Sequence, residues 1–283
     1  KIYKDNDIVI CDSWKSINAV PDKVKKIIVF AHGQEYLATK KTNLIKKSLY
    51  RANHIISSSN YTLDLINNMN ITEIKKSVIP PTYSLKATDE NNIFKQPTKK
   101  VSILSITRLE ERKGIIPVLK SLGYLHKEKL IKPFIWEICG EGNQETEIKN
   151  YIDNLGLSKH VRLLGRVSNE IKNQLLKKAD LFVMPSYKVK NSIEGFGISY
   201  IEAASYGVPS IAGVEGGIRD AVFDMKTGWC VDPLNSSLLL DTIKEAINNE
   251  SKREKFGLEA KKQFLKKFLG EKVFRKFMNT INS

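Results

Sequence analysis

Short runs rich in β-branched residues alternate with stretches of helical periodicity along most of this chain. The strand-like runs cover residues 7–11, 26–31, 54–57, 76–79, 101–107, 134–139, 160–164, 181–184 and 209–212. Helical patterns between them cover residues 114–125, 145–155, 169–178 and 196–206. Strands that alternate with helices form parallel sheets with both faces covered. The sequence therefore predicts an α/β protein built on parallel sheets.

A polar stretch at residues 81–100 interrupts this alternation. It contains two prolines and the run Asp-Glu-Asn-Asn, and it has no sustained apolar period. These features predict a linker between two α/β domains. We expect an N-terminal domain with the linker at residues 1–96, a C-terminal domain at 97–262, and helices at 263–283 that return to the N-terminal domain. The first domain has room for only half a doubly wound unit, and it lacks an early glycine-rich loop.

The formal net charge of +15 predicts an anionic partner. One basic cluster has small and apolar residues between its cations at helical spacing, and it contains Lys40, Lys41, Lys46, Lys47 and Arg51. This pattern fits a helix at a membrane surface and equally an ordinary surface helix. A second basic cluster, at residues 252–276, is predicted to be helical throughout and to form a solvated face. No basic motif interleaved with aromatic residues is present, so nucleic acid is not the expected partner.

The cysteines and the hydropathy pattern indicate the cellular compartment in which the protein is expected to work. Cys11, Cys139 and Cys230 lie far apart without CxxC spacing, which favours buried thiols in a reducing compartment over a disulfide framework or a zinc site. No apolar run reaches the roughly 18 residues of a membrane span, and no signal peptide pattern opens the chain. We expect a cytoplasmic protein, with peripheral binding at the inner face of the cell membrane if the first basic cluster contacts lipid.

Two carboxylates eight residues apart bracket a glycine-flanked aromatic residue in the run Glu194-Gly195-Phe196-Gly197-Ile198-Ser199-Tyr200-Ile201-Glu202. About three acidic pairs at this spacing are expected by chance among 31 acidic residues, so the neighbouring residues carry the argument. Glu202 is the only charged residue between Gly195 and Val214, and a carboxylate in an apolar stretch needs a partner. A ribose diol fits, because one carboxylate accepts from both hydroxyls. A helix-capping Glu194 followed by a solvated Glu202 is the alternative.

A cationic loop follows the strand-like run at residues 101–107. Arg108 leaves that run, and Lys113 comes just before the next helical pattern. Two cations near a helix start form a strong diphosphate site. We expect Arg108 and Lys113 to bind phosphate, with scattered surface charge as the alternative.

Other candidate residues also follow predicted strands, and ligands bind at the carboxyl ends of strands in open parallel sheets. Gly140 and Gly142 allow a nucleotide to approach the backbone closely, or they form a plain tight turn. Arg166 faces either a base edge or solvent. His32 is placed to reach an interdomain cleft as a polar contact or proton acceptor, although a lone histidine also serves structural roles.

Taken together, several motifs resemble retaining glycosyltransferase family 4. They are Glu-x7-Glu with Gly-Phe-Gly, the pair Arg108 and Lys113, Gly140-x-Gly142, and the downstream Gly-x-Pro and Gly-Gly. The family uses nucleotide sugars and has the GT-B fold, which implies two Rossmann-like domains facing a cleft, here with a shortened N-terminal domain. The resemblance implies that Arg108 and Lys113 hold the donor diphosphate and that Glu202 holds the ribose. It also implies that the transferred sugar and its phosphate contact Glu194 and the backbone of Gly195, Phe196, Gly197 and Ile198.

The resemblance implies a hexosyltransferase that moves sugar from a UDP- or GDP-sugar to a glycan or lipid-linked acceptor in cell-surface polysaccharide synthesis. Glu194, Arg108, Lys113 and His32 are the expected catalytic residues, and no metal or other cofactor is expected. The sequence departs from the family at Thr107, where glycine is usual, and at Asp220, where glutamate is common. A catalytically inactive nucleotide-sugar-binding subunit and a sugar-nucleotide epimerase are the alternatives.

Overall fold

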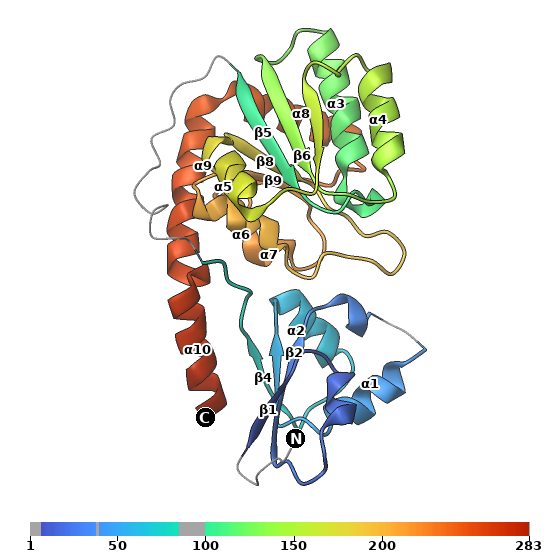
Figure 1. The fold of residues 1–283 in the computed structure, drawn as a ribbon, viewed down its shortest axis with the longest axis vertical. Coiled ribbons are helices and arrows are strands. Elements are labelled where there is room, and N and C mark those ends of the chain that lie inside the picture. Colours follow the sequence, from blue (N-terminus) through green and yellow to red (C-terminus); the bar gives the residue numbers. More distant parts are fainter. Residues whose placement is uncertain (1–6, 38–39, 85–99, 283) are drawn as a thin grey trace.

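A computed structural model describes residues 7–37, 40–84 and 100–282 of the chain. Two α/β units lie one above the other along the long axis of the molecule (Figure 1). Each is built on a parallel sheet, so the predicted α/β fold is confirmed. Residues 85–99, most of the predicted linker, lie outside the described residues.

The N-terminal unit contains a four-stranded parallel sheet in the order β1-β2-β3-β4. Its strands are β1 (Ile8–Cys11), β2 (Lys26–Ala31), β3 (His54–Ser57) and β4 (Lys75–Val78). Its helical elements are the 3₁₀ turns η1 (Ser16–Ala19) and η2 (Gln34–Tyr36) and the helices α1 (Thr42–Leu49) and α2 (Asn60–Asn67). Ser59 caps α2, since its hydroxyl accepts a hydrogen bond from the amide of Thr62 at 3.1 Å.

Helix α1 contains Lys46 and Lys47 of the first predicted basic cluster, whereas Lys40 and Lys41 precede the helix and Arg51 follows it. Its apolar residues Ile45 and Leu49 are buried in the core of the N-terminal unit. Leu44, predicted on the same apolar face, is instead about half exposed beside the lysines. Most of the amphipathic character of α1 is therefore explained by packing within the domain.

The C-terminal unit contains a six-stranded parallel sheet in the order β10-β9-β8-β5-β6-β7. Its strands are β5 (Val101–Ile106), β6 (Phe134–Cys139), β7 (Val161–Gly165), β8 (Leu181–Met184), β9 (Ser210–Ala212) and β10 (Gly228–Cys230). Its first helices are η4 (Glu111–Lys113), α3 (Ile115–Lys127), α4 (Glu145–Asn154), α5 (Asn169–Lys178), α6 (Ile198–Ser205) and α7 (Ile218–Ala221). The chain proceeds outward from β5 in one direction and from β8 in the other, so the topological switch point lies between these two strands.

Buried side chains cover both faces of the C-terminal sheet. One apolar cluster, around Trp136 and Phe134, packs under α3 and α8, and the other, around Phe182 and Tyr200, packs under α6. Strand β10 was not predicted, because it is only three residues long and begins with a glycine. Two buried faces explain why the central strand β8 is a continuous apolar run, Leu-Phe-Val-Met, rather than an alternating pattern.

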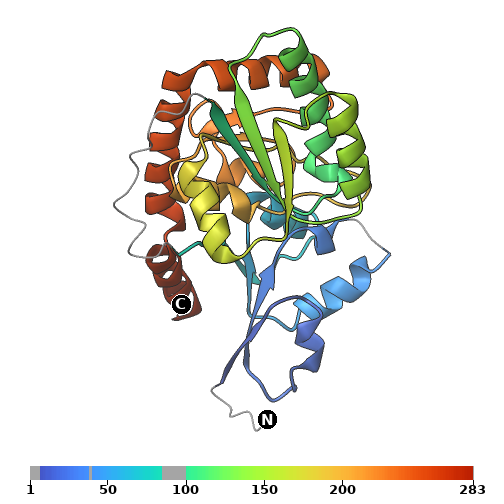
Figure 2. The ribbon, with the colours of Figure 1, turned by 45° about the horizontal axis from the view of Figure 1, so that its top comes forward.

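The last helices are α8 (Ser236–Asn248), α9 (Glu250–Gln263), a π-helical turn η5 (Phe264–Phe268) and α10 (Gly270–Asn282). Residues 252–276, expected to be helical, are helical except at Leu269, which adopts an extended conformation between η5 and α10. Helix α10 runs beside the N-terminal sheet (Figures 1 and 2). The Lys276 ammonium donates to the carbonyl of Val78 at 2.7 Å, and Val273 packs with Ile28 and Ile56.

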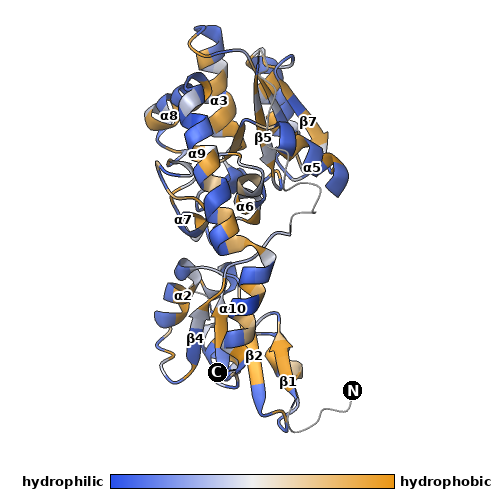
Figure 3. Ribbon diagram, turned by 90° about the vertical axis from the view of Figure 1, so that its left-hand side faces the viewer, coloured by the Kyte–Doolittle hydropathy of each residue, from blue (hydrophilic) through white to orange (hydrophobic). Residues whose placement is uncertain are grey.

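Hydrophobic residues concentrate on the strands, whereas α9 and α10 show mixed hydropathy along their length (Figure 3). Within the described ranges, none of the helices combines the length and apolar character required to traverse a bilayer.

Candidate active site

The start of α6 lies against the end of β5, at the switch point of the C-terminal sheet. The Ser199 hydroxyl, in the first turn of α6, donates to the carbonyl of Ile106 at 2.9 Å. Gly197 enters α6 in the left-handed region with φ of 93°, and a β-carbon there would lie 2.4 Å from the Tyr200 ring. The segment after Glu194 and the loop that carries Arg108 and Lys113 therefore share one edge of the sheet.

A buried ion cluster connects these two segments. Oε2 of Glu194 accepts hydrogen bonds from the Lys113 ammonium and, at 3.0 Å, from Nη1 of Arg112. The side chains of Arg112 and Lys113 are only 5% and 8% exposed, and that of Glu194 is 15% exposed. Buried charges require such pairing, because a lone charge loses its hydration without compensation.

Local backbone structure fixes both cations. They occupy the 3₁₀ turn η4, which ends at Gly114 in the left-handed region. A β-carbon at Gly114 would lie 2.4 Å from the carbonyl oxygen of Pro185, so only glycine fits where the η4 loop passes the loop after β8. The amide of Tyr187 also donates to the carbonyl of Arg112 at 2.9 Å. These contacts hold the cations beside Glu194.

Burial and charge shift the pKa values of this cluster. Burial lowers the pKa of Lys113 below its ordinary 10.5, and the neighbouring Arg112 and Arg108 act in the same direction, although Glu194 opposes them. Burial alone would raise the pKa of Glu194, but the attraction of Lys113 and Arg112 outweighs it and holds that pKa below its usual value. Glu194 is therefore ionised at neutral pH.

Arg108 lies in the same loop but outside the buried cluster. Its side chain is 67% exposed, and its guanidinium pairs with Glu110 at 2.6 Å. The two predicted phosphate-binding cations thus have different partners, and Arg112, which the sequence analysis did not select, takes the buried position. The only sequence signal for Arg112 was its position between Arg108 and Lys113.

Glu202 has a protein partner that the sequence did not reveal. The Lys172 ammonium, from α5, donates to Oε1 of Glu202 at 2.6 Å, and both side chains are largely buried. The same ammonium lies 5.5 Å from the centre of the Tyr83 ring. The solvated alternative for Glu202 is therefore wrong, and one of its carboxylate oxygens is held by Lys172.

The glycines after β6 serve chain packing. A β-carbon at Gly140 would lie 1.7 Å from the carbonyl oxygen of Thr107, and one at Gly142 would lie 2.3 Å from that of Leu109. The loop after β6 is hydrogen-bonded to the loop after β5 through the Leu109 amide and the Glu141 carbonyl at 2.9 Å. Arg166, after β7, is exposed. Nucleotide contacts of Gly140, Gly142 and Arg166 remain predictions.

The two units contact each other beside Glu194. A β-carbon at Gly195 would lie 2.0 Å from the carbonyl oxygen of His32, and Gly33 lies against Gly195 as well. The Gln34 side-chain amide donates to the carbonyl of Ile193 at 2.7 Å. The His32 ring is exposed, and its Nε2 lies 2.9 Å from the carbonyl oxygen of Asp12. The strand end that carries His32 therefore approaches the backbone of the Glu194 segment.

A second interdomain contact uses Asp220, the position where this sequence departs from the resembled family. The Asp220 carboxylate accepts from the amide and the side-chain NH₂ of Asn60, at 2.5 and 2.8 Å, at the start of α2. Gly217 packs nearby, since a β-carbon there would lie 1.9 Å from the carbonyl oxygen of Gly195. The Gly-Gly motif thus allows three chain segments to meet at the interface.

Phe196 and Ile198, the remaining predicted residues, lie at the entry to α6. Phe196 is buried and makes an edge contact with Phe268, with ring centroids 5.8 Å apart. Ile198, the first residue of α6, is about half exposed. Phe196 therefore anchors the segment to the C-terminal helices while Ile198 remains accessible from solvent.

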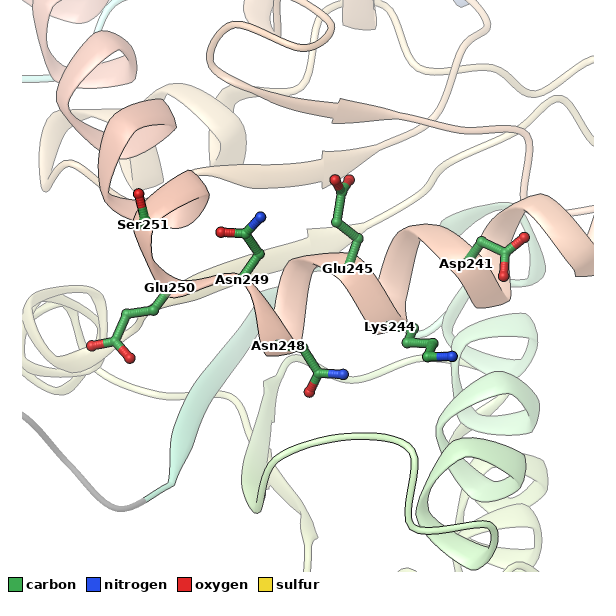
Figure 4. Close-up of a pocket in the computed structure, with 7 residues that line it drawn as sticks. All are labelled: Asp241, Lys244, Glu245, Asn248, Asn249, Glu250 and Ser251. Atoms are coloured by element: carbon green, nitrogen blue, oxygen red, sulfur yellow. The ribbon is translucent and has the colours of Figure 1, made fainter.

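A separate shallow hollow of about 630 Å³ lies at the junction of α8 and α9. Its polar side chains point in different directions instead of converging on one point (Figure 4). Glu245, one of them, already accepts from Trp229 at 2.7 Å and from Lys252 at 2.5 Å. This hollow contains no residue of the buried ion cluster. Across the described ranges, no group of three or more His, Cys, Asp or Glu residues is arranged to hold a metal ion.

A family profile described as "Glycosyl transferases group 1" matches residues 87–263, which is more than half of the chain. The protein belongs to the glycosyl transferases group 1 family. The match includes Arg108, Lys113, Glu194 and Glu202, and so covers the buried ion cluster.

Two curated relatives of this member of the glycosyl transferases group 1 family illustrate the sequence similarity. The 2-deoxystreptamine N-acetyl-D-glucosaminyltransferase of Niallia circulans is 29% identical over 187 residues, covering 65% of this chain and 46% of the relative. The putative colanic acid biosynthesis glycosyltransferase WcaL of Escherichia coli is 30% identical over 139 residues, covering 48% of this chain and 34% of the relative. The matched segments span less than half the length of these two relatives.

Solved structures support the fold. HepE of Anabaena, solved with UDP and glucose, superimposes with a TM-score of 0.80 at 18% identity, covering 98% of this chain and 78% of HepE. TarM of S. aureus superimposes with a TM-score of 0.78 at 22% identity, covering 98% of this chain and 55% of TarM. At these identities the likeness establishes the fold of this family member, which is GT-B, as predicted.

Proposed function

We propose that this protein is a retaining glycosyltransferase of family 4 that transfers a sugar from a nucleoside-diphosphate sugar to a glycan or lipid-linked acceptor in cell-surface polysaccharide synthesis. The observation that carries the proposal is the buried cluster of Lys113, Arg112 and Glu194 at the switch point between β5 and β8. Ligands bind at this position in doubly wound sheets. Relatives named as glycosyltransferases and a neighbour solved with UDP and glucose support the reaction class and donor type.

The chemistry follows from the charges at this edge. When the bond between the sugar and the diphosphate breaks, negative charge grows on the leaving phosphate and an oxocarbenium-like character develops on the sugar. Lys113 and Arg112 are preorganised in a water-poor position, and one such contact contributes roughly 3–4 kcal/mol to transition-state stabilisation. Arg108 is exposed and can reach the phosphate only from the solvent side. His32 lies at the interface, on the acceptor side of the proposed site.

A thermal-shift screen tests the proposal directly. The protein is incubated with UDP, GDP and their sugar conjugates, and a ligand that binds the folded state raises the melting temperature. We expect one nucleoside diphosphate and its sugar to stabilise the protein and the other to have little effect. If neither series raises the melting temperature, the proposal is wrong.

Two alternatives are distinguished by activity assays with the donor. An epimerase would convert the donor without an acceptor, so product analysis with donor alone identifies it. A nucleotide-sugar-binding subunit would bind the donor but turn it over only with a second polypeptide. The partial coverage of the relatives, 46% and 34% of their lengths, keeps this second alternative relevant.

The ribose role of Glu202 is tested by Glu202→Gln. One carboxylate oxygen is held by Lys172, and the other is proposed to accept from the ribose. Hydrogen bonds to charged groups contribute about 1.5–3 kcal/mol, so we expect affinity for the nucleoside diphosphate to fall by at least about 10-fold. Calorimetric titration measures this loss, and pyrophosphate, which has no ribose, should bind the variant normally. Full nucleotide affinity in the variant would contradict the role.

The lowered pKa of Lys113 predicts a pH dependence of donor binding. A lysine whose pKa lies below 10.5 loses its proton at a lower pH than an exposed lysine does. We therefore expect the diphosphate affinity to fall as the pH rises through the alkaline range. Lys113→Arg is the control, because arginine stays charged there, so its affinity should fall less. Parallel pH profiles of the two proteins would contradict a binding role for Lys113.

Peripheral contact with an anionic membrane through α1 is part of the proposal. Lys40, Lys41 and Lys47 are exposed beside the half-exposed Leu44. Each cation near an anionic bilayer contributes about 1 kcal/mol, so charge reversal at Lys40, Lys41, Lys46 and Lys47 should abolish sedimentation with anionic vesicles. Four reversals on the C-terminal helices, at Lys255, Lys262, Lys266 and Lys272, change the net charge equally and serve as the control. Equal loss of binding in both variants would contradict a specific role for α1.

A further inference from the structure

The buried ion cluster poses a problem for donor binding. The cations proposed to hold the donor diphosphate already share one carboxylate oxygen of Glu194. Within the part of the chain that the structure describes, the Lys113 ammonium has one hydrogen-bond partner besides Glu194, the Met184 sulfur at 3.8 Å, and sulfur is a weak acceptor. The positive charge of Lys113 is therefore compensated mainly by Glu194 in this structure.

A diphosphate and the Glu194 carboxylate compete for the same donors. Both are anions, and their repulsion is strong in a water-poor site where the dielectric constant is low. Charge-assisted hydrogen bonds from the two cations can be directed to phosphate or to Glu194. The cations therefore cannot hold a diphosphate fully while they remain paired with Glu194.

The backbone of Glu194 restricts how the competition is resolved. Its carbonyl accepts from the amide of Gly217 at 2.9 Å, and the adjacent Gly195 is packed against the carbonyl of His32. The main chain is thus held by contacts on both sides. The carboxylate of Glu194 is therefore displaced by rotation about its side-chain bonds and not by movement of the main chain.

We propose that Glu194 is the resident counterion of the phosphate-binding cations, and that an arriving diphosphate displaces its carboxylate and so releases it for the transferred sugar. This inference rests on the proposed function and adds an internal switch to it. The carboxylate blocks the site against weak anions, and it reaches the sugar only once the diphosphate is in place. Removing the carboxylate should consequently improve phosphate binding while it impairs transfer.

The test uses inorganic pyrophosphate, because it needs no assumption about the base. Glu194→Gln is compared with wild type by calorimetric titration, and we expect pyrophosphate to bind the variant at least about 10-fold more tightly, as expected for close charge pairs. Glu250→Gln removes the same charge from an exposed carboxylate that pairs with Lys132, outside the ion cluster, and should leave pyrophosphate affinity unchanged. Sugar transfer by Glu194→Gln should be lost in the same preparations. Equal or weaker pyrophosphate binding by Glu194→Gln would overturn the inference.

Two further variants keep the test decisive. Glu194→Asp shortens the side chain and replaces Glu194→Gln in the test if the glutamine variant does not fold. It should bind pyrophosphate more tightly than wild type, by a smaller factor than that expected for Glu194→Gln. When Glu194→Gln is added to Lys113→Met, the gain in pyrophosphate affinity should be smaller than when Glu194→Gln is added to wild type, because the two residues act through one contact. An equal gain in both backgrounds would overturn the inference.

The outcomes separate this inference from the function on which it rests. Wild-type binding of UDP or GDP without a gain in Glu194→Gln overturns only the counterion role. Absence of binding of pyrophosphate, UDP and GDP to wild type and to all variants overturns the proposed function and the inference together.

Discussion

Replacing Lys113 with methionine is expected to lower kcat by about 10²- to 10³-fold, because the variant loses a buried cation aimed at the leaving phosphate. Lys113 is the better test than Arg108, since it is buried against Glu194 whereas Arg108 is largely exposed. Steady-state kinetics with saturating donor measure the effect. A loss in kcat with a smaller change in donor KM would indicate that the charge acts mainly in the transition state.

The control for this substitution is Lys132→Met. Lys132 forms an exposed ion pair with Glu250 at 3.4 Å, on the far side of the C-terminal unit from the ion cluster, and exposed pairs contribute little to stability. Its kcat should match wild type. Circular dichroism checks that Lys113→Met remains folded, since Glu194 is then left with Arg112 alone. A folded Lys113→Met variant with less than about a threefold loss of kcat would contradict the phosphate role.

Replacing Gly195 with alanine is expected to reduce turnover by about 100-fold or more, because it prevents the two units from approaching as they do here. A β-carbon at this position would lie 2.0 Å from the carbonyl oxygen of His32, and backbone atoms on both sides cannot yield easily. The units must separate or the loops must move. Either change displaces the acceptor side of the site relative to Glu194.

Nucleotide binding should be affected less than turnover in Gly195→Ala, because the phosphate-binding cations belong to the C-terminal unit alone. Small-angle scattering should record a larger radius of gyration than wild type if the units separate. Gly270→Ala, at the start of α10, is the matched control. The added β-carbon would lie 3.1 Å from the Ser84 hydroxyl, which can move aside by rotation of its side chain. Wild-type turnover in Gly195→Ala would show that this close contact is not needed for transfer.

The positions of most strands were predictable from the sequence, because strands buried on both faces consist of continuous β-branched runs whatever their neighbours are. Strand β10 was not predicted, because a three-residue segment that begins with glycine is too short to show a strand pattern in the sequence. The extended residue Leu269 between η5 and α10 was not predicted either, because the helical periodicity continues across it.

The sequence by itself determined the parallel α/β architecture and the edge at which Glu194, Lys113 and Glu202 gather, since chain order and strand direction place all three at carboxyl ends of strands or in the helix that follows. Only the tertiary structure decided the pairings: Glu194 with Lys113 and Arg112 across more than 80 residues, and Glu202 with Lys172 across 30. It also decided that Gly140 and Gly195 are needed for chains to pass closely. Such pairings depend on loop paths and side-chain rotamers, which are fixed by contacts between segments distant in sequence and leave no local pattern.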